Sequence, residues 1–135
     1  MKKTDKTDRE WQKELTYEQY RVTRLGATEA PFSGQYDDFY ETGVYRCVCC
    51  NAKLFLSANK FNAGCGWPSF DAPHDEDKLA RQDDRLIPGM PRIEVKCEYC
   101  DAHLGHVFDD GPTETGLRYC INSVALQFEA DDDDK

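Results

Sequence analysis

A short cysteine motif occurs twice in this chain of 135 residues, and it constrains the fold more than any other feature. The two copies, Cys47–Leu54 and Cys97–Leu104, share the form C-x-x-C-[N/D]-A-x-L, and strand-like residues precede each of them. A C-x-x-C turn between two strands points both sulfurs the same way. The residue after the second cysteine then needs a left-handed backbone, which Asn51 and Asp101 tolerate better than other residues that carry a Cβ.

Two such turns supply four thiolates, which form a closed tetrahedral set of ligands for one structural zinc ion. The predicted ligands are Cys47, Cys50, Cys97 and Cys100. The 46 residues between the two turns exceed what a minimal zinc ribbon contains, so we expect a whole subdomain between them.

Two other uses of these cysteines are less consistent with the sequence than the zinc site. A redox C-x-x-C usually begins a helix next to a βαβ unit, and neither copy has that context. A local Cys₂His₂ site could use Cys97, Cys100, His103 and His106, but it would leave the first pair of cysteines without a role and crowd its ligands into one turn. The extra cysteine of the first copy, Cys49, is best explained as a small apolar filler.

The local patterns predict a mainly β fold with two short helices at its N-terminus. Capping-box spacing at Thr7–Glu10 and Thr16–Gln19 predicts the helices, the second of which ends near Arg24 before Gly26. The charged stretch 71–85 is expected to be a surface excursion with room for a helical turn.

Strands are predicted wherever apolar residues alternate with polar ones. This pattern is found at 92–96 and 124–128, and the segment 116–123 also resembles a strand. Glycines and prolines punctuate the regions between, so the strands are expected to be short and antiparallel.

Composition limits the classes of partner. Formal net charge is −9, of which the four Asp and one Lys of Asp131–Lys135 supply −3. That run matches a protease-recognition tag, so the expected single domain is 1–130. No basic face is available for phosphates, which argues against a nucleic-acid binder. No secretory signal or membrane-length apolar run is seen, so we expect a cytoplasmic protein that does not enter membranes.

Seven cysteines in a chain of this kind predict reduced thiols, metal ligands or catalytic groups instead of a disulfide framework. One of them, Cys120, lies on the same strand face as Arg118 and Asn122. A free thiol with a pKa of about 8.5 is little ionised at neutral pH. The nearby guanidinium favours the thiolate, which is the reactive species. Cys120 is therefore a candidate reactive thiol, and a buried structural cysteine is the alternative.

A second candidate thiol, Cys65, lies between Gly64 and Gly66 and is followed by Trp67. The glycines let the backbone move, and the indole offers a large apolar surface. A turn with an inert cysteine and a core tryptophan explains these residues equally well.

His103 and His106 are two of only three histidines, and Phe108 follows them. Imidazoles paired in this way can donate or relay protons near neutral pH. A functional pair is favoured modestly over two structural histidines.

Three segments, together with the cysteine motifs, closely resemble the methionine-R-sulfoxide reductases of the MsrB type. The segments are GCGWPSF at 64–70, HLGHVFDDGP at 103–112 and RYCINS at 118–123. They occur in the family's order, and the resemblance extends from about Trp11 to Phe128. Only Cys49 departs from the common pattern, and it does not disturb the spacing of the four ligands.

The resemblance implies a fold of two antiparallel sheets (a β-tent) with short N-terminal helices, and a structural zinc ion remote from the active site. It implies an oxidoreductase for protein repair under oxidative stress, which reduces the R epimer of methionine sulfoxide in oxidised proteins. Thioredoxin would return the oxidised enzyme to its dithiol form.

Carried over residue by residue, the resemblance makes Cys120 the nucleophile and Cys65 the resolving cysteine, linked in a Cys65–Cys120 disulfide during turnover. Trp67 resembles the plate that receives the substrate methyl group, and Arg118 the residue that tunes the thiol. The remaining implied site residues are His103, His106, Phe108 and Asn122.

The residues themselves suit this chemistry. A sulfoxide oxygen leaves poorly unless it is protonated, so an attacking thiolate needs an acid such as a histidine. Attack leaves a cysteine sulfenic acid, which condenses with a second thiol. A zinc-ribbon binding module without catalysis is the competing class, and it leaves Cys65, Cys120 and the two histidines unexplained.

Overall fold

The computed structural model describes residues 8–37, 39–84 and 92–130. The predicted cap at Thr7, the end of the charged stretch at Arg85 and the tail 131–135 lie outside these ranges. In the part of the chain that is described, no helix combines the length and apolar character that a membrane crossing requires.

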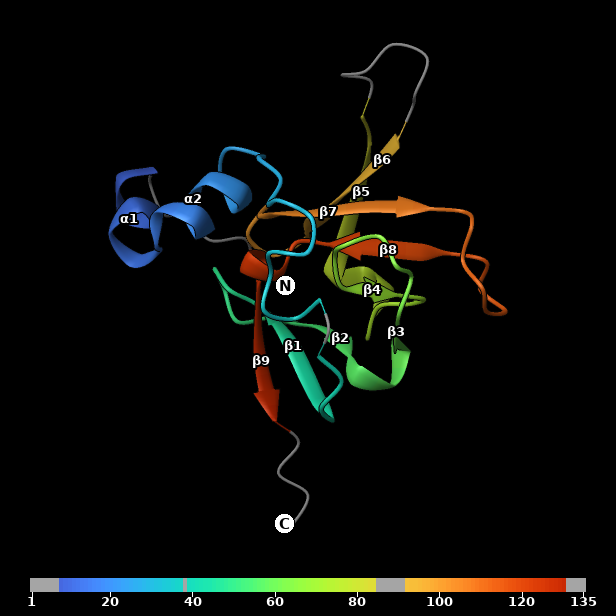
Figure 1. Ribbon diagram of the computed structural model, residues 1–135. Coiled ribbons are helices and arrows are strands. Elements are labelled where there is room, and N and C mark those ends of the chain that lie inside the picture. Colours follow the sequence, from blue (N-terminus) through green and yellow to red (C-terminus); the bar gives the residue numbers. More distant parts are fainter. Residues whose placement is uncertain (1–7, 38, 85–91, 131–135) are drawn as a thin grey trace.

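Two antiparallel sheets form the framework of the molecule, as the sequence predicted (Figure 1). The small sheet contains, in spatial order, β2 (Lys53–Leu56), β1 (Gly43–Cys47) and β9 (Leu126–Ala130). The large sheet contains, in spatial order, β3 (Lys60–Phe61), β4 (Ser69–Phe70), β8 (Arg118–Ile121), β7 (His103–Phe108), β6 (Arg92–Cys97) and β5 (Leu79–Asp84). Among the described residues, three 3₁₀ turns lie between strands: η1 (Ser57–Asn59), η2 (Glu76–Lys78) and η3 (Ser123–Ala125).

Two short helices, α1 (Asp8–Glu14) and α2 (Tyr17–Thr23), precede the sheets. The predicted capping box of α2 is present: the Thr16 hydroxyl accepts from the Gln19 backbone, and the Gln19 side chain accepts from the Thr16 backbone. Helix α2 packs against η3 and β7, which places the loop after it beside the end of β8.

Aromatic side chains fill the space between the sheets. Phe55 of the small sheet stacks on Phe70 of the large sheet at 4.4 Å, and Tyr45 meets the same ring edge-on at 5.1 Å. Tyr119 of β8 contacts Phe55 at 5.9 Å. All four rings are fully buried, so β8 is held rigidly from its core side.

Two sequence interpretations need correction. The charged stretch that was expected to be a surface excursion contains η2 and then the six-residue strand β5, which pairs along the whole of β6. Its Leu79-Ala80-Arg81-Gln82 run has one large apolar residue, so cross-strand hydrogen bonds outweighed weak patterning. The strand predicted at 124–128 begins only at Leu126, because Ser123–Ala125 forms a 3₁₀ turn first.

A bulge in β7 determines where two of the candidate residues point. His103 pairs with Lys96 and Gly105 pairs with Val95, which leaves Leu104 without a partner on β6. Residues three apart on a regular strand face opposite sides of the sheet. The extra residue reverses this, so His103 and His106 lie on one face with their rings 5.6 Å apart.

Candidate active site

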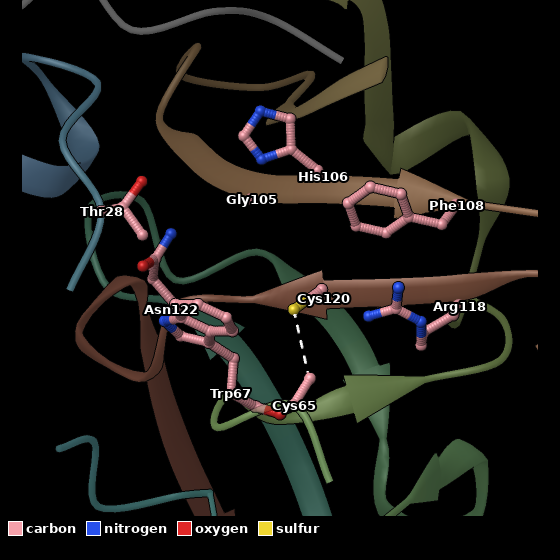
Figure 2. A pocket seen from close by; sticks show the side chains of 9 residues that line it. All are labelled: Thr28, Cys65, Trp67, Gly105, His106, Phe108, Arg118, Cys120 and Asn122. Atoms are coloured by element: carbon pink, nitrogen blue, oxygen red, sulfur yellow. Dashed lines mark hydrogen bonds between the residues drawn. The ribbon is translucent and has the colours of Figure 1, made fainter. Parts of the chain in front are cut away.

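A cavity of about 260 Å³ opens where β7, β8 and the 64–67 loop meet. We call this cavity the thiol pocket. Figure 2 shows Cys120 at its centre, with His106 and Phe108 of β7 on one side and Cys65 and Trp67 of the loop on the other. Its lining residues are Thr28, Cys65, Trp67, Gly105, His106, Phe108, Arg118, Cys120 and Asn122.

Strand β8 and the residue directly after it supply three of these residues by simple alternation. Arg118, Cys120 and Asn122 line the pocket, whereas Tyr119 and Ile121 are fully buried in the core. The strand face predicted from the sequence is therefore the face that the structure shows.

Gly105 brings β7 close to Cys120. A side chain at this position would collide with the backbone carbonyl of Cys120. The absence of a Cβ is thus what allows the two strands to form one wall of the pocket.

The loop that carries Cys65 depends on its flanking glycines. Gly64 and Gly66 have φ of +70° and +94°, in the left-handed region that favours glycine. A Cβ on Gly66 would also crowd Pro31. This path places the Cys65 sulfur 3.5 Å from the Cys120 sulfur and 3.4 Å from the Ser69 hydroxyl.

The two thiols together lose one of their two protons easily and share the other. Hydrogen bonding to Cys120 lowers the pKa of Cys65 to about 5, with further help from Ser69 and Arg118. The same hydrogen bond, together with burial, raises the pKa of Cys120. The pair therefore carries one negative charge near neutral pH, held between the two sulfurs.

Arg118 lies beside this charge. Its guanidinium forms a two-point ion pair with Asp110, at 2.8 and 3.2 Å, and stacks over the Phe108 ring at 4.5 Å. Arg118 lowers the pKa of Cys120, as the sequence indicated, but Cys65 and burial act in the opposite direction and are stronger.

The two histidines occupy different positions. His106 lines the thiol pocket, whereas His103 is 5% exposed and lies behind it. The Nδ1 atom of His103 lies 2.6 Å from Glu94, and its Nε2 atom has no hydrogen-bond partner among the described residues. Burial lowers the pKa of His103, so this imidazole is neutral at pH 7.

Trp67 and Asn122 are oriented by one peptide segment of the loop after α2. The Trp67 indole donates to the carbonyl of Glu29 at 3.0 Å, and the backbone N–H of Glu29 donates to the Asn122 side chain at 2.9 Å. The Asn122 amide in turn donates to Leu104 at 3.0 Å. Both pocket residues are therefore held in fixed orientations.

The four predicted metal ligands converge at a separate place. Their sulfur atoms all lie within 4.8 Å of one another, and the Cys47–Cys100 and Cys50–Cys97 separations are both 3.6 Å. A tetrahedral zinc ion with Zn–S bonds of about 2.3 Å requires sulfurs about 3.8 Å apart. The donor set and its spacing therefore fit a metal ion.

Both cysteine turns have the predicted backbone. Asn51 and Asp101 have φ of 70° and 65°, and the N–H of each donates to the first cysteine of its turn at 2.8 Å. One turn follows β1 of the small sheet and the other follows β6 of the large sheet. The cluster thus joins the two sheets.

The sequence is similar to those of known proteins over almost its whole length. The SelR domain matches residues 15–130. A Hahella chejuensis protein named peptide methionine sulfoxide reductase MsrB is 56% identical over 134 residues, which are 99% of this chain and 96% of that protein. The chain belongs to the MsrB family.

Other MsrB relatives match to a similar extent. The protein of that name from Herminiimonas arsenicoxydans is 57% identical over 131 residues, or 97% of this chain and 95% of its own length. The one from Chromohalobacter salexigens is 58% identical over 127 residues, covering 93% and 95%. The resemblance drawn from the three sequence motifs is therefore confirmed.

Several residues of this MsrB site were not found by sequence reasoning. Thr28 lines the pocket and Glu29 holds Trp67 and Asn122, and both come from a loop with no pattern of its own that follows α2, which packs against β7. Glu94 occupies an ordinary polar position of a predicted strand. Its contact with His103 depends on the bulge in β7, which no local sequence pattern predicts.

Proposed function

We propose that this MsrB-family protein reduces the R epimer of methionine sulfoxide in proteins, with Cys120 as the nucleophile and Cys65 as the resolving thiol. The observation that carries the proposal is the 3.5 Å separation of the two sulfurs inside a pocket that also contains Trp67 and His106. An apolar plate, a proton donor and a thiol pair are the groups that sulfoxide reduction requires.

The first step begins with the proton that the two thiols share. At rest Cys65 carries the negative charge and Cys120 the proton, so the Cys65 thiolate can take that proton along their hydrogen bond when the substrate is bound and leave a thiolate on Cys120. That thiolate attacks the sulfoxide sulfur while an acid protonates the oxygen. We assign the acid to His106, because it lines the pocket and His103 does not.

The products of this step follow from electron balance. The sulfoxide sulfur gains two electrons and leaves as methionine, and Cys120 loses two and becomes a sulfenic acid. The Cys65 thiol then displaces water from that sulfenic acid and forms the Cys65–Cys120 disulfide. A dithiol protein of the thioredoxin kind reduces the disulfide by thiol–disulfide exchange.

The stereochemical part of the proposal rests on the two walls of the pocket. Trp67 lies on one side of Cys120 and His106 on the other (Figure 2). A chiral sulfur that places its methyl group on the indole and its oxygen toward the imidazole can present only one lone-pair arrangement to the nucleophile. The R epimer is the one we assign to this arrangement.

We also propose that Cys47, Cys50, Cys97 and Cys100 hold one zinc ion with a structural role. A closed set of four thiolates leaves no position for a substrate, so the ion contributes to folding and takes no part in the reaction. None of the seven cysteines is in a disulfide bond, which suits the reducing cytoplasm that we propose as the location.

One assay tests the activity. The protein is incubated with dithiothreitol and a peptide that contains either the R or the S epimer of methionine sulfoxide, and methionine is measured by chromatography. We expect turnover of the R epimer only. Comparable reduction of the S epimer contradicts the assignment of the pocket walls, and no methionine from either epimer contradicts the function.

A further inference from the structure

A second cavity, of about 560 Å³, lies next to the thiol pocket. We call it the outer cavity. Two residues, Cys65 and Arg118, line both cavities. Among the described residues, the lining of the outer cavity includes Cys65 but does not include Cys120. Its remaining lining residues are Phe61, Asn62, Ala63, Gly64, Asp110 and Pro112.

We propose that the outer cavity is where a dithiol reductant protein docks, and that this protein attacks the sulfur of Cys65. The inference rests on the proposed function, because it concerns the step that reduces the Cys65–Cys120 disulfide. A thiolate attacks a disulfide along the S–S axis, from the side opposite the departing sulfur. For attack at Cys65 that side faces away from Cys120, and the outer cavity is the space that contacts the one cysteine without the other.

Reduction of the disulfide at Cys65 is a two-step thiol–disulfide exchange. The reductant thiolate forms a bond to the Cys65 sulfur, the S–S bond breaks, and Cys120 departs with the electron pair as a thiolate. Arg118 stabilises negative charge on Cys120. The second thiol of the reductant then releases Cys65, so the reductant loses two electrons and two protons and the enzyme regains both thiols.

The outer cavity is also accessible to the surface of another protein. Asn62, Ala63 and Gly64 are all exposed, and nothing lies within 4 Å of the place where a Cβ of Gly64 would be. The Asn62 side chain accepts from the Gly64 backbone at 2.9 Å, which fixes the loop with its open side outward. A sulfur presented on the flat surface of a partner can therefore approach Cys65 without entering the thiol pocket.

Filling the outer cavity tests this proposal. The Ala63→Trp variant places bulk in the cavity, and Ala130→Trp is the matched control on the exposed end of β9 in the other sheet. The disulfide is formed in each protein with the oxidant diamide and checked by peptide mapping, and its reduction by thioredoxin is followed in a stopped-flow instrument. We expect Ala63→Trp to slow this reduction by about tenfold or more, the size of effect seen at important interface positions. The control is expected to match the unmodified protein.

A single-turnover measurement separates this proposal from the function itself. Methionine formed per enzyme from the sulfoxide peptide, without reductant, should be the same in Ala63→Trp and the unmodified protein. Loss of this burst in Ala63→Trp overturns the idea of a separate entrance, as does an unchanged rate of thioredoxin reduction. A missing burst in the unmodified protein contradicts the function instead, and the diamide experiment still decides the docking site.

Chemical trapping identifies the attacked sulfur directly. A thioredoxin whose second cysteine is replaced by serine stops at the mixed disulfide, which mass spectrometry of peptides can locate. We expect the bond on Cys65. A bond on Cys120 overturns the proposal.

Discussion

The sulfur atoms of Cys65 and Cys120 lie 3.5 Å apart across the wall of one pocket, only about 1.5 Å beyond the length of a disulfide bond. Gly64 and Gly66 flank Cys65, so a small change in the backbone of the loop closes this distance. The reduced protein is thus already close to the geometry of its oxidised form.

The shared proton makes a prediction about pH. Thiolates react with iodoacetamide and thiols do not, so alkylation of Cys65 should stay fast as the pH falls from 8 to 6 and decline through about 5. The Cys120→Ala variant removes the largest cause of the lowered pKa, so its decline should occur at higher pH. Peptide mapping of alkylated Cys65 measures both profiles. A profile in the unmodified protein centred near the ordinary thiol pKa of about 8.5 contradicts the pairing.

The two thiols should respond differently to replacement. Cys120→Ser removes the nucleophile, so no methionine should form with any reductant. Cys65→Ser retains the nucleophile, so one methionine per enzyme should still form, and dithiothreitol should sustain slow turnover by reducing the sulfenic acid. Thioredoxin-driven turnover should be lost, because thioredoxin acts on a disulfide. If Cys65→Ser cycles normally with thioredoxin, another thiol such as Cys49 resolves the intermediate.

Metal content is the next prediction. The protein should carry about one zinc per chain, measured by atomic emission, and Cys97→Ser should lose it. Since metal binding contributes directly to folding, the variant should be less stable by at least about 3 kcal/mol in urea unfolding. Cys49→Ser is the matched control and should retain both zinc and stability. A metal-free protein with unchanged unfolding argues against the site.

His106 and His103 should differ in their effect on the sulfoxide step. Replacing His106 with Gln removes the acid, so the rate of methionine formation should fall by about 10²–10⁴-fold while substrate still binds. His103→Gln should have a smaller effect, because that imidazole lies behind the pocket. Single-turnover rates at saturating substrate measure both, and equal losses would mean that the two rings act as one relay.

His103 should instead affect stability as a function of pH. Burial lowers the pKa of the folded His103 below its usual value of 6.5, so folding favours the neutral ring. The stabilisation is complete above pH 6.5 and is lost as the unfolded chain takes up a proton at lower pH. Between pH 7.5 and 5.5 the unmodified protein should therefore lose more stability than His103→Gln. Urea unfolding of both proteins at the two pH values measures this difference. An equal loss of stability in the two proteins would contradict the prediction.

Short-range patterns in the sequence predicted what depends on short-range physics. Alternation placed Arg118, Cys120 and Asn122 on one face, and the C-x-x-C spacing identified the four cysteines that converge and their left-handed neighbours. Features that depend on distant contacts could not be predicted. The β7 bulge and strand β5 both arise from pairing with β6, which no single stretch of sequence encodes.

The contact between Cys65 and Cys120 also depends on residues that are distant in the sequence. The 3.5 Å contact joins residues 55 positions apart in the sequence, so it follows from the assembled sheet and from the path of the glycine loop. Which histidine reaches the cavity depends on the bulge, and Glu94 becomes a partner of His103 for the same reason. The paired spacing and the family resemblance assigned both histidines to the site without distinguishing them.

The position of the cysteine cluster has a consequence for the search that the unfolded chain must make. An ion bound to Cys50 and Cys97 closes a chain segment of 48 residues, and Cys65 lies inside that segment while Cys120 lies outside it. By the loop-closure relation, a cross-link of this length lowers the entropy of the unfolded chain by an amount worth on the order of 4 kcal/mol. Bound there, such an ion would take no part in the chemistry, yet it would shorten the conformational search through which one redox thiol finds the other.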